Sequence, residues 1–264
     1  MNTAHIAELL DPFLRAPVVV PETSGLSESS HSDVPGPCHS EPAKAGEACP
    51  ERSRREPAVL SPAQLQSIST YIDILVRWNA RVNLTAIRDP EDIVTRHFGE
   101  SFFAACHLFP APSSVSSVSS VVKAFDSVAD LGSGAGFPGL PIKLWSPHLS
   151  VTLIESNHKK AAFLREVTRA LTLTDVNIQN ARAETLTATT FDVVTLRAVE
   201  HFAAILPTAA ALVAPAGRLA LLISAAQQDQ ARSTLPHLTW SNPAPVPHSR
   251  SRILLVARRP QYPQ

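Results

Sequence analysis

The sequence predicts an α/β fold with a doubly wound, mainly parallel sheet behind an all-helical N-terminal segment. From about residue 125 onward, short apolar runs alternate with stretches of helical period, the pattern of strand–helix–strand units. A turn with four of the nine glycines follows the first apolar run, over residues 132–139. In such sheets a ligand binds at the carboxyl ends of the strands, so we look for functional residues where the strands end.

Residues 1–24 predict one N-terminal helix with five apolar side chains on one face: Ile6, Leu9, Leu10, Phe13 and Leu14. This start lacks the basic and continuously apolar regions of a signal peptide. Residues 25–57 are rich in Ser, Pro, Glu and Arg and poor in large apolar residues, which predicts a disordered insert. The chain has no run of about 18 apolar residues, so no membrane span is expected.

Composition narrows the function only slightly. The 264 residues carry 23 basic and 23 acidic side chains, so any nucleic-acid contact would depend on local arginine clusters. The three cysteines form no C-x-x-C pair, which favours a reduced, cytoplasmic protein. The spacing of Cys38, His39 and Cys49 fits no common zinc site, and we expect no metal.

Residues 58–110 predict a helical cap. Ser61, Pro62 and Gln64 form the signature of a capped helix start, and apolar residues recur at helical spacing up to Trp78. A second helix is expected after Asp89-Pro90.

Residues 111–264 predict the ligand-binding core. A low-complexity loop at 113–120 precedes it. Helices are expected at 139–145, 158–171 and 202–213, the last closed by Pro215 and Gly217. Strands are expected at 127–130, 151–154, 176–179, 191–196, 219–223, 238–240 and 253–257, the last two antiparallel.

The glycine-rich turn can be read in two frames. Gly134-x-Gly136-x-x-Gly139 spells the fingerprint of dinucleotide-binding folds, but there the first glycine follows the strand directly. The second frame, Asp130-x-Gly132-x-Gly134-x-Gly136, begins at the strand's end, as in methyltransferases that use S-adenosylmethionine (SAM). We favour SAM as the cofactor, with an NAD(P)-dependent oxidoreductase as the alternative.

Other strand ends supply further candidate SAM contacts. Glu155 ends the second strand, where a carboxylate can accept hydrogen bonds from a ribose diol. Ala183-Glu184 follow the third strand, near the expected adenine, although Glu184 also suits a plain surface acid. Arg197 ends the fourth strand and could bind the SAM carboxylate or an RNA phosphate, or form a structural salt bridge.

Several segments together resemble one family, the bacterial 16S rRNA (guanine-N7) methyltransferase G family (RsmG, also called GidB). The resemblance runs from about Leu60 to the C-terminus. It rests on Arg77-Trp78-Asn79, the run from Asn83 to Pro90, Arg96-His97 with Glu100-Ser101, and the run from Asp130 to Ile142. The family often has a basic Lys-Gly pair where this chain has Ile223-Ser224.

The resemblance implies a class I, Rossmann-like SAM-dependent enzyme that methylates N7 of one guanine, the family's guanine 527, in 16S rRNA. It places SAM contacts at Gly132, Phe137, Ala183-Glu184 and Arg197, and we add Gly134, Gly136 and Glu155 from the loop and strand ends. The partner would be 16S rRNA or the small-subunit particle, and the protein a monomer. A SAM methyltransferase of another substrate remains an alternative.

Guanine N7 has a lone pair and no proton to lose, so no general base is expected and alignment would carry the reaction. Candidate RNA contacts in the cap are Arg77, Arg81, Arg88, Arg96 and His97. For His97, a structural role on a half-buried helix face fits the sequence equally well. Further candidate arginines lie near the end of the chain: Arg250, Arg252, Arg258 and Arg259.

Overall fold

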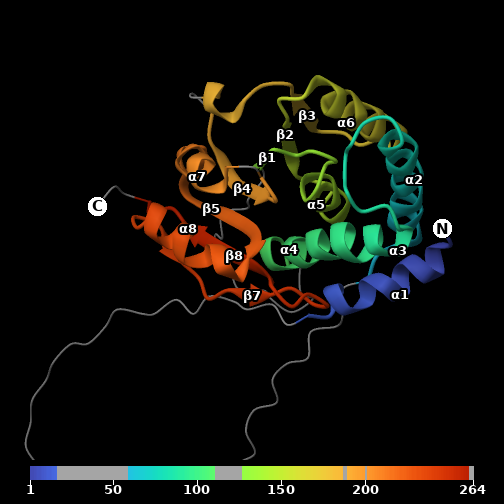
Figure 1. Ribbon diagram of the computed structural model, residues 1–264, viewed down its shortest axis with the longest axis horizontal. Helices are drawn as coiled ribbons and strands as arrows, with labels where there is room; N and C mark the ends of the chain where they lie inside the picture. Colours follow the sequence, from blue (N-terminus) through green and yellow to red (C-terminus); the bar gives the residue numbers. More distant parts are fainter. Residues whose placement is uncertain (17–58, 111–126, 187–188, 200, 262–264) are drawn as a thin grey trace, which may run out of the picture.

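The computed structural model describes residues 1–16, 59–110, 127–186, 189–199 and 201–261 (Figure 1). The predicted insert at 25–57 and the loop at 113–120 lie outside these residues.

The helices are α1 (Thr3–Leu14), α2 (Pro62–Asn79), α3 (Pro90–Asp92), the π-helix η1 (Ile93–Gly99), α4 (Glu100–Leu108), α5 (Gly139–Trp145), α6 (His158–Ala170), the 3₁₀-helices η2 (Ala183–Thr185) and η3 (Ala225–Gln227), α7 (Phe202–Ala211) and α8 (Gln228–Thr234). The strands are β1 (Ser127–Leu131), β2 (Ser150–Ile154), β3 (Val176–Gln179), β4 (Phe191–Arg197), β5 (Val213–Ser224), β6 (Thr239–Trp240), β7 (Ala244–Pro245) and β8 (Arg252–Arg258).

One sheet organises the molecule and confirms the predicted α/β fold. Its strand order is β3-β2-β1-β4-β5-β8-β6, with β7 also paired to β8. The strands from β3 to β5 are parallel, and β8 returns antiparallel beside β5, as predicted for the end of the chain. The chain order reverses between β1 and β4, the switch point at which ligands bind in sheets of this kind.

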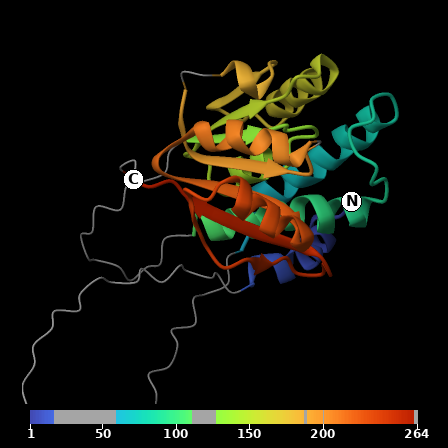
Figure 2. The same ribbon diagram turned by 60° about the vertical axis from the view of Figure 1, so that its left-hand side comes forward.

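Both faces of the sheet are covered, because successive strand residues point to opposite sides. In β4, Val193 belongs to a core shared with α1, α2, η1, α4, α5 and α6, whereas Val194 belongs to a second core under α7 and α8. Figure 2 shows α7 and α8, in orange and red, in front of the sheet. This two-sided burial explains why the strands are apolar without alternation.

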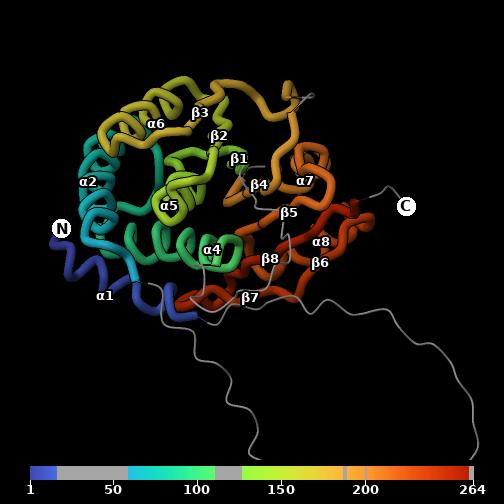
Figure 3. The backbone as a smooth tube through the Cα atoms, turned by 180° about the vertical axis from the view of Figure 1, so that it is seen from behind, coloured from blue at the N-terminus to red at the C-terminus, as the bar shows by residue number. Residues whose placement is uncertain are grey.

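The helical segment at 62–108 shares the core of one sheet face, and α2 lies beside α6 when the molecule is seen from behind (Figure 3). The predicted capping box is present: the Gln64 backbone N–H donates to Ser61 Oγ at 3.3 Å, and the Ser61 N–H donates to Gln64 Oε1 at 2.7 Å. The predicted helix start at Asp89 is also present, because its carboxylate accepts the N–H groups of Glu91 and Asp92.

A π-helical segment that the sequence did not predict interrupts the helix between α3 and α4. Gly99 ends this segment, and a Cβ atom built there would lie 2.6 Å from the ring of Phe13. The missing side chain therefore admits the Phe13 ring, and α1 packs directly on η1. π-Helical turns are rare and are frequently found at functional sites.

The region around residues 211–219 corrects the prediction. Strand β5 begins at Val213 rather than Leu219, so Pro215 and Gly217 lie inside the strand and do not terminate a helix. The register between β4 and β5 shifts between Phe191 and Val193, and a Cβ atom on Gly217 would lie 2.8 Å from two carbonyl oxygens. These breaker residues therefore mark an irregular strand pairing. The short elements β7 and α8 were also not predicted.

Two kinds of feature are absent from the described residues. None of the helices they form is long and apolar enough to span a membrane. No three His, Cys, Asp or Glu side chains among them gather as ligands for a metal ion.

Candidate functional site

Three neighbouring strand ends bring the predicted site residues together. Leu131 of β1 is in register with Ile154 of β2 on one side and with Leu196 of β4 on the other. The glycine loop, Glu155 and Arg197 follow these strands, so all three lie at the same carboxyl edge. The sequence predicted each at a strand end, and the parallel register makes them neighbours.

The glycines of the loop are required by its backbone. Gly132, Gly134 and Gly136 all have positive φ angles, of 67°, 55° and 85°. A Cβ atom on Gly132 would lie 2.9 Å from Val199, and one on Gly136 would collide with the Tyr71 hydroxyl. Gly134 faces open space, because the nearest atom to such a Cβ lies 3.7 Å away within the loop. The loop is therefore packed from below and open at Gly134.

The backbone N–H groups of this loop argue against dinucleotide binding. Those of Gly132 and Ser133 both donate to the Ile154 carbonyl, at 2.9 and 3.1 Å, and that of Gly136 donates to Ser133 at 2.6 Å. The first N–H of α5, on Gly139, donates to the Asp130 carboxylate at 3.2 Å. A pyrophosphate needs free N–H groups at a helix N-terminus. In this loop the N–H groups of Gly132, Ser133 and Gly136 already have partners. The Asp130 carboxylate accepts the first N–H of α5, where a pyrophosphate would have to bind.

Asp130 is fully buried beneath the loop and ties three elements together. Its carboxylate accepts the Gly139 N–H of α5 and the Thr195 hydroxyl of β4, the latter at 2.9 Å. Burial raises its pKa to about 6, although these hydrogen bonds and the charge of Arg197 oppose the shift. Asp130 therefore shapes the loop from inside the protein.

The carboxylate of Glu155 fits the expected ribose contact. Oε2 accepts the Gly134 N–H at 2.9 Å and Oε1 accepts the Asn157 N–H at 2.7 Å, in a residue that is 7% exposed. An ionised carboxylate has about four acceptor positions, so about two are left for a vicinal diol. These two bonds also fix the carboxylate against the open part of the loop. The remaining acceptor positions therefore suit the ribose hydroxyls at the nucleoside end of SAM.

The predicted adenine contacts lie in the short helix η2. Ala183 is buried and joins the core beneath α7, while the Glu184 side chain is exposed. The role of these residues stays a prediction.

The ring of Phe137 is held on both faces. Tyr71 stacks on one face at 5.4 Å between centroids, and His97 stacks on the other at 4.8 Å. Phe98 approaches the ring edge at 5.0 Å. Because both faces are covered, a cofactor could contact this residue through its backbone but could not stack on the ring.

His97 is buried, and its environment favours the structural role that the sequence left open. Its Nε2 atom lies 2.7 Å from the Thr85 hydroxyl, and Nδ1 has no hydrogen-bond partner among the described residues. Burial, followed by the charges of Arg197, Arg96 and Arg252, lowers its pKa to about 3, so the ring is neutral. A ring that is 7% exposed does not face external RNA here.

Arg197 forms the salt bridge that the sequence left open as an alternative. Its Nε and Nη2 atoms donate to Oε2 of Glu100 at 3.1 and 3.0 Å, and Nη2 also donates to the Arg96 carbonyl at 2.7 Å. Arg252 donates to the same glutamate oxygen at 3.4 Å. Arg252 pairs in register with Ser224, so a basic side chain stands beside the position where the resemblance expects one.

The predicted RNA-contact arginines are exposed: Arg77, Arg81, Arg88 and Arg96. Arg77 lies 3.8 Å from Glu166 of α6, which partly offsets its charge. The C-terminal candidates separate into two groups, because β8 runs antiparallel to β5. Arg252 starts β8 at the carboxyl edge, whereas Arg258 pairs with Arg218 near the opposite edge of the sheet.

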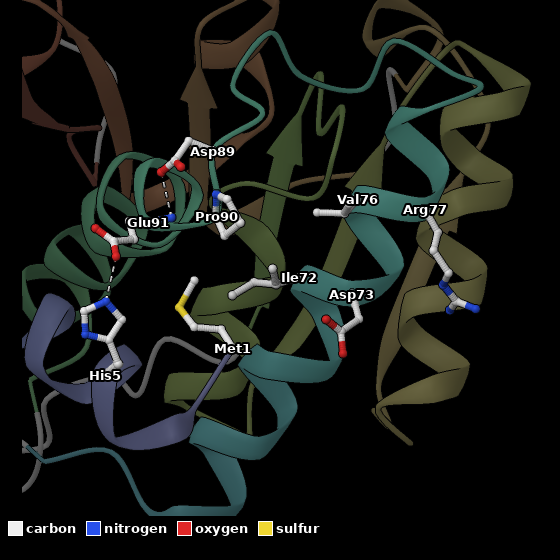
Figure 4. A pocket seen from close by; sticks show the side chains of 9 residues that line it. All are labelled: Met1, His5, Ile72, Asp73, Val76, Arg77, Asp89, Pro90 and Glu91. Atoms are coloured by element: carbon white, nitrogen blue, oxygen red, sulfur yellow. Dashed lines mark hydrogen bonds and ion pairs between the residues drawn. The ribbon is translucent and has the colours of Figure 1, made fainter.

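A hollow of about 680 Å³ lies away from the glycine loop, between α1, α2 and the start of α3 (Figure 4). Asp89, Glu91 and Asp73 face it together with Met1 and Ile72, and His5 bonds to Glu91 at its edge. Its lining is partly acidic, which does not suit RNA. We therefore assign the functional site to the sheet edge.

Sequence reasoning missed Asn79 and Glu100 as site residues, although both belong to the motifs quoted above. The Asn79 side chain accepts the N–H groups of Leu84 and Thr85 and donates to the Thr85 carbonyl at 2.9 Å. It thereby shapes the loop after α2 and places the Thr85 hydroxyl against His97. The Asn-x-x-x-Asn-Leu-Thr spacing was the signal for this role.

Comparison with known proteins decides the family. The family model described as rRNA small subunit methyltransferase G matches residues 64–244, more than half of the chain. The chain belongs to this family. The resemblance inferred from its motifs, and the enzyme class inferred with it, are confirmed.

Individual relatives support the same family assignment. The methyltransferase G of Listeria monocytogenes serotype 4b is 33% identical over 221 residues, covering 77% of this chain and 87% of the relative. That of Roseiflexus sp. is 46% identical over 149 residues, covering 54% and 58%. A ribosomal protein L11 methylase from Lactobacillus delbrueckii has a TM-score of 0.50 at 13% identity, covering 62% of this chain and 79% of its own, and shows the fold alone. Membership in the methyltransferase G family makes SAM the methyl donor and excludes the oxidoreductase alternative.

Proposed function

We propose that this protein transfers the methyl group of SAM to N7 of one guanine in 16S rRNA, at the family's position 527. Family membership carries the substrate class. The observation that carries the site is the common edge where an open Gly134, a fixed Glu155 carboxylate and the Arg197 guanidinium meet. An adenosine ribose against Glu155 and a methionine carboxylate near Arg197 would span this edge, with the backbone of the glycine loop between them.

The chemistry needs alignment more than acid or base groups. SAM supplies a methyl group on a sulfonium ion: its transfer breaks the S–C bond, forms the C–N7 bond and moves the positive charge from sulfur to the base, with no proton released. Holding N7 in line can contribute up to roughly 7–11 kcal/mol. Two titratable side chains beside the loop suit this role: His97 stays neutral and Asp130 is buried below the loop.

The target guanine must expose its N7 edge, so we infer that RNA meets the protein at the same carboxyl edge. Arg96 is the first candidate, because its side chain is exposed while its carbonyl is bonded to Arg197. Arg81 and Arg88 flank the loop that Asn79 organises, and Arg77 ranks last because Glu166 partly offsets its charge. Removing any one arginine that binds a phosphate should reduce the salt slope of RNA binding by about 0.7–0.9.

The decisive experiment is methyl transfer from labelled SAM to RNA of a strain that lacks the enzyme. Naked 16S rRNA and small-subunit particles are tested side by side, and the labelled nucleotide is identified after digestion. We expect N7-methylguanosine at one position. SAM binding without label in either RNA would refute the RNA substrate and leave a methyltransferase of another substrate.

A matched variant tests the cofactor site. Glu155→Gln keeps the shape of the side chain and removes the charge that strengthens its hydrogen bonds, which are typically worth about 1.5–3 kcal/mol. SAM affinity measured by calorimetry should fall at least tenfold. An unchanged affinity would contradict the ribose contact.

We also infer that the protein acts in the cytoplasm as a monomer. The rRNA substrate supports the location, since small ribosomal subunits are assembled there. Sedimentation of the purified protein, alone and with SAM, tests the monomer: a concentration-dependent dimer would overturn it.

A further inference from the structure

Glu100, in the first turn of α4, binds guanidinium groups that come from two different strands. Its Oε2 atom accepts Nε and Nη2 of Arg197, from the end of β4, and Nη2 of Arg252, from the start of β8. The Glu100 side chain is only 7% exposed. We call these three residues the Glu100 cluster. It ties the helical segment to the carboxyl edge of the sheet, beside the glycine loop.

Glu100 binds the guanidinium of Arg197 on one side only. The hydrogen bonds use Nε and Nη2, and Nη2 is fixed further by the Arg96 carbonyl. Among the described residues, no protein acceptor binds Nη1 of Arg197. The planar guanidinium carries five N–H groups in a rigid arrangement. Fixing the side with Nε and Nη2 therefore also fixes the direction of the N–H groups of Nη1. Within the part of the chain that the structure describes, the two N–H groups of Nη1 therefore have no acceptor and are available to a ligand.

The charges of the cluster favour an anionic acceptor. Two guanidinium groups share one carboxylate, which leaves a net charge of +1 within the cluster; outside it, the charge of the buried Asp130 also acts on Arg197. Arg252 is held in turn by the Leu222 carbonyl, at 3.0 Å, and thus does not leave the cluster freely. A buried charge without a partner is costly, so an incoming carboxylate or phosphate oxygen would be stabilised here.

We propose that Glu100 is a positioning residue: with Arg252, it holds Arg197 so that Nη1 receives an anionic oxygen group of a ligand. The inference rests on the proposed function. It gives Glu100, one of the residues that carry the family resemblance, a role that acts by way of Arg197. The oxygen group comes from one of two sources, the methionine carboxylate of SAM or a phosphate of the RNA. The competing interpretation is a salt bridge that only stabilises the fold.

A double-mutant cycle separates these interpretations, using Glu100→Gln, Arg197→Met and the double variant. Calorimetry measures the Kd of SAM and of decarboxylated SAM, which lacks only the carboxylate. Fluorescence anisotropy measures the Kd of a 16S rRNA fragment. If the carboxylate is the ligand group, Glu100→Gln weakens SAM binding about tenfold or more, leaves decarboxylated SAM unchanged, and has no further effect once Arg197 is methionine.

The other outcomes are equally informative. If the phosphate is the ligand group, the same pattern occurs with the RNA fragment and not with SAM. Unchanged Kd values for both ligands, tighter SAM binding, or a loss that persists in the Arg197→Met background would overturn the proposal. Absence of SAM binding by the unaltered protein would instead refute the proposed function.

Controls address the fold. Glu166→Gln is the matched variant, because Glu166 also bonds to an arginine and to the Trp78 indole, but on α6 away from the loop. It should leave the Kd of SAM unchanged. If Glu100→Gln does not fold, Glu100→Asp, which keeps the charge and shortens the reach by one methylene, enters the same cycle and should show a smaller loss of SAM or RNA affinity.

Discussion

The buried carboxylate of Asp130 makes a quantitative prediction about stability and pH. Burial raises its pKa from 3.8 to about 6 in the folded protein. At about 1.36 kcal/mol per pKa unit, the difference corresponds to about 3 kcal/mol. The native protein binds more protons than the unfolded chain across this range. The stabilisation is therefore complete below about pH 4 and is lost as the pH rises through about 6.

Asp130→Asn isolates this contribution, because asparagine keeps the size and one acceptor oxygen but does not titrate. The free energy of unfolding is measured with urea from pH 5 to pH 7 for both proteins. With these pKa values, the unaltered protein should lose about 1 kcal/mol more than the variant over that range. Subtracting the two curves removes the titration of every other group.

A second variant checks the cause of the shift. The Thr195 hydroxyl donates to Asp130 and lowers its pKa, so Thr195→Val should move the loss of stability to higher pH. Parallel curves for the unaltered protein and Asp130→Asn would refute the reasoning. They would mean that Asp130 has the same pKa in the folded and unfolded states.

Three further substitutions test the packing around the site, each by urea unfolding. Gly136→Ala should cost about 2–4 kcal/mol, since its new methyl group meets Tyr71 at a φ of 85°, whereas Gly134→Ala, in open space, should cost only about 1 kcal/mol. Equal losses would show that packing under the loop does not matter. Phe13→Ala should cost about 3–5 kcal/mol, because the ring is 2% exposed and fills the notch at Gly99. A cost below about 1 kcal/mol would contradict the docking of α1. Ser61→Ala should cost about 1 kcal/mol through removal of the cap of α2, and an unchanged stability would refute the capping box.

Local patterns predicted most of the fold, and contacts distant in sequence account for the errors. Helix α2 was predicted to within one residue because Ser61, Pro62 and Gln64 act on neighbouring backbone groups. The start of β5 was missed because Pro215 and Gly217 resemble a helix stop. Pairing with β4 at Val213 and Arg218, on either side of them, and the bond from the Arg259 N–H to the Gly217 carbonyl keep this segment in the strand.

The same division applies to the site. The position of the glycine loop and of Glu155 at one sheet edge could be predicted, because each lies directly after a strand and parallel strands end at one edge. The role of Glu100 could not, since its partners Arg197 and Arg252 lie 97 and 152 residues away. The close contact between Gly99, at the end of the π-helix, and Phe13 of α1 is likewise between residues far apart in the sequence.

The N-terminal motif of the family acts mostly inside this protein. Asn79 folds the loop after α2, Thr85 of that loop contacts His97, and His97 covers one face of Phe137 in the glycine loop. These contacts join the exposed arginines of the cap to the cofactor edge by a continuous chain of packed groups. Arg81 and Arg88 border this loop, which therefore reaches from the protein surface to the residues that enclose Phe137. His97 is buried between Thr85 and Phe137 and thus packs the loop after α2 against the glycine loop, while its role as an RNA contact stays a prediction.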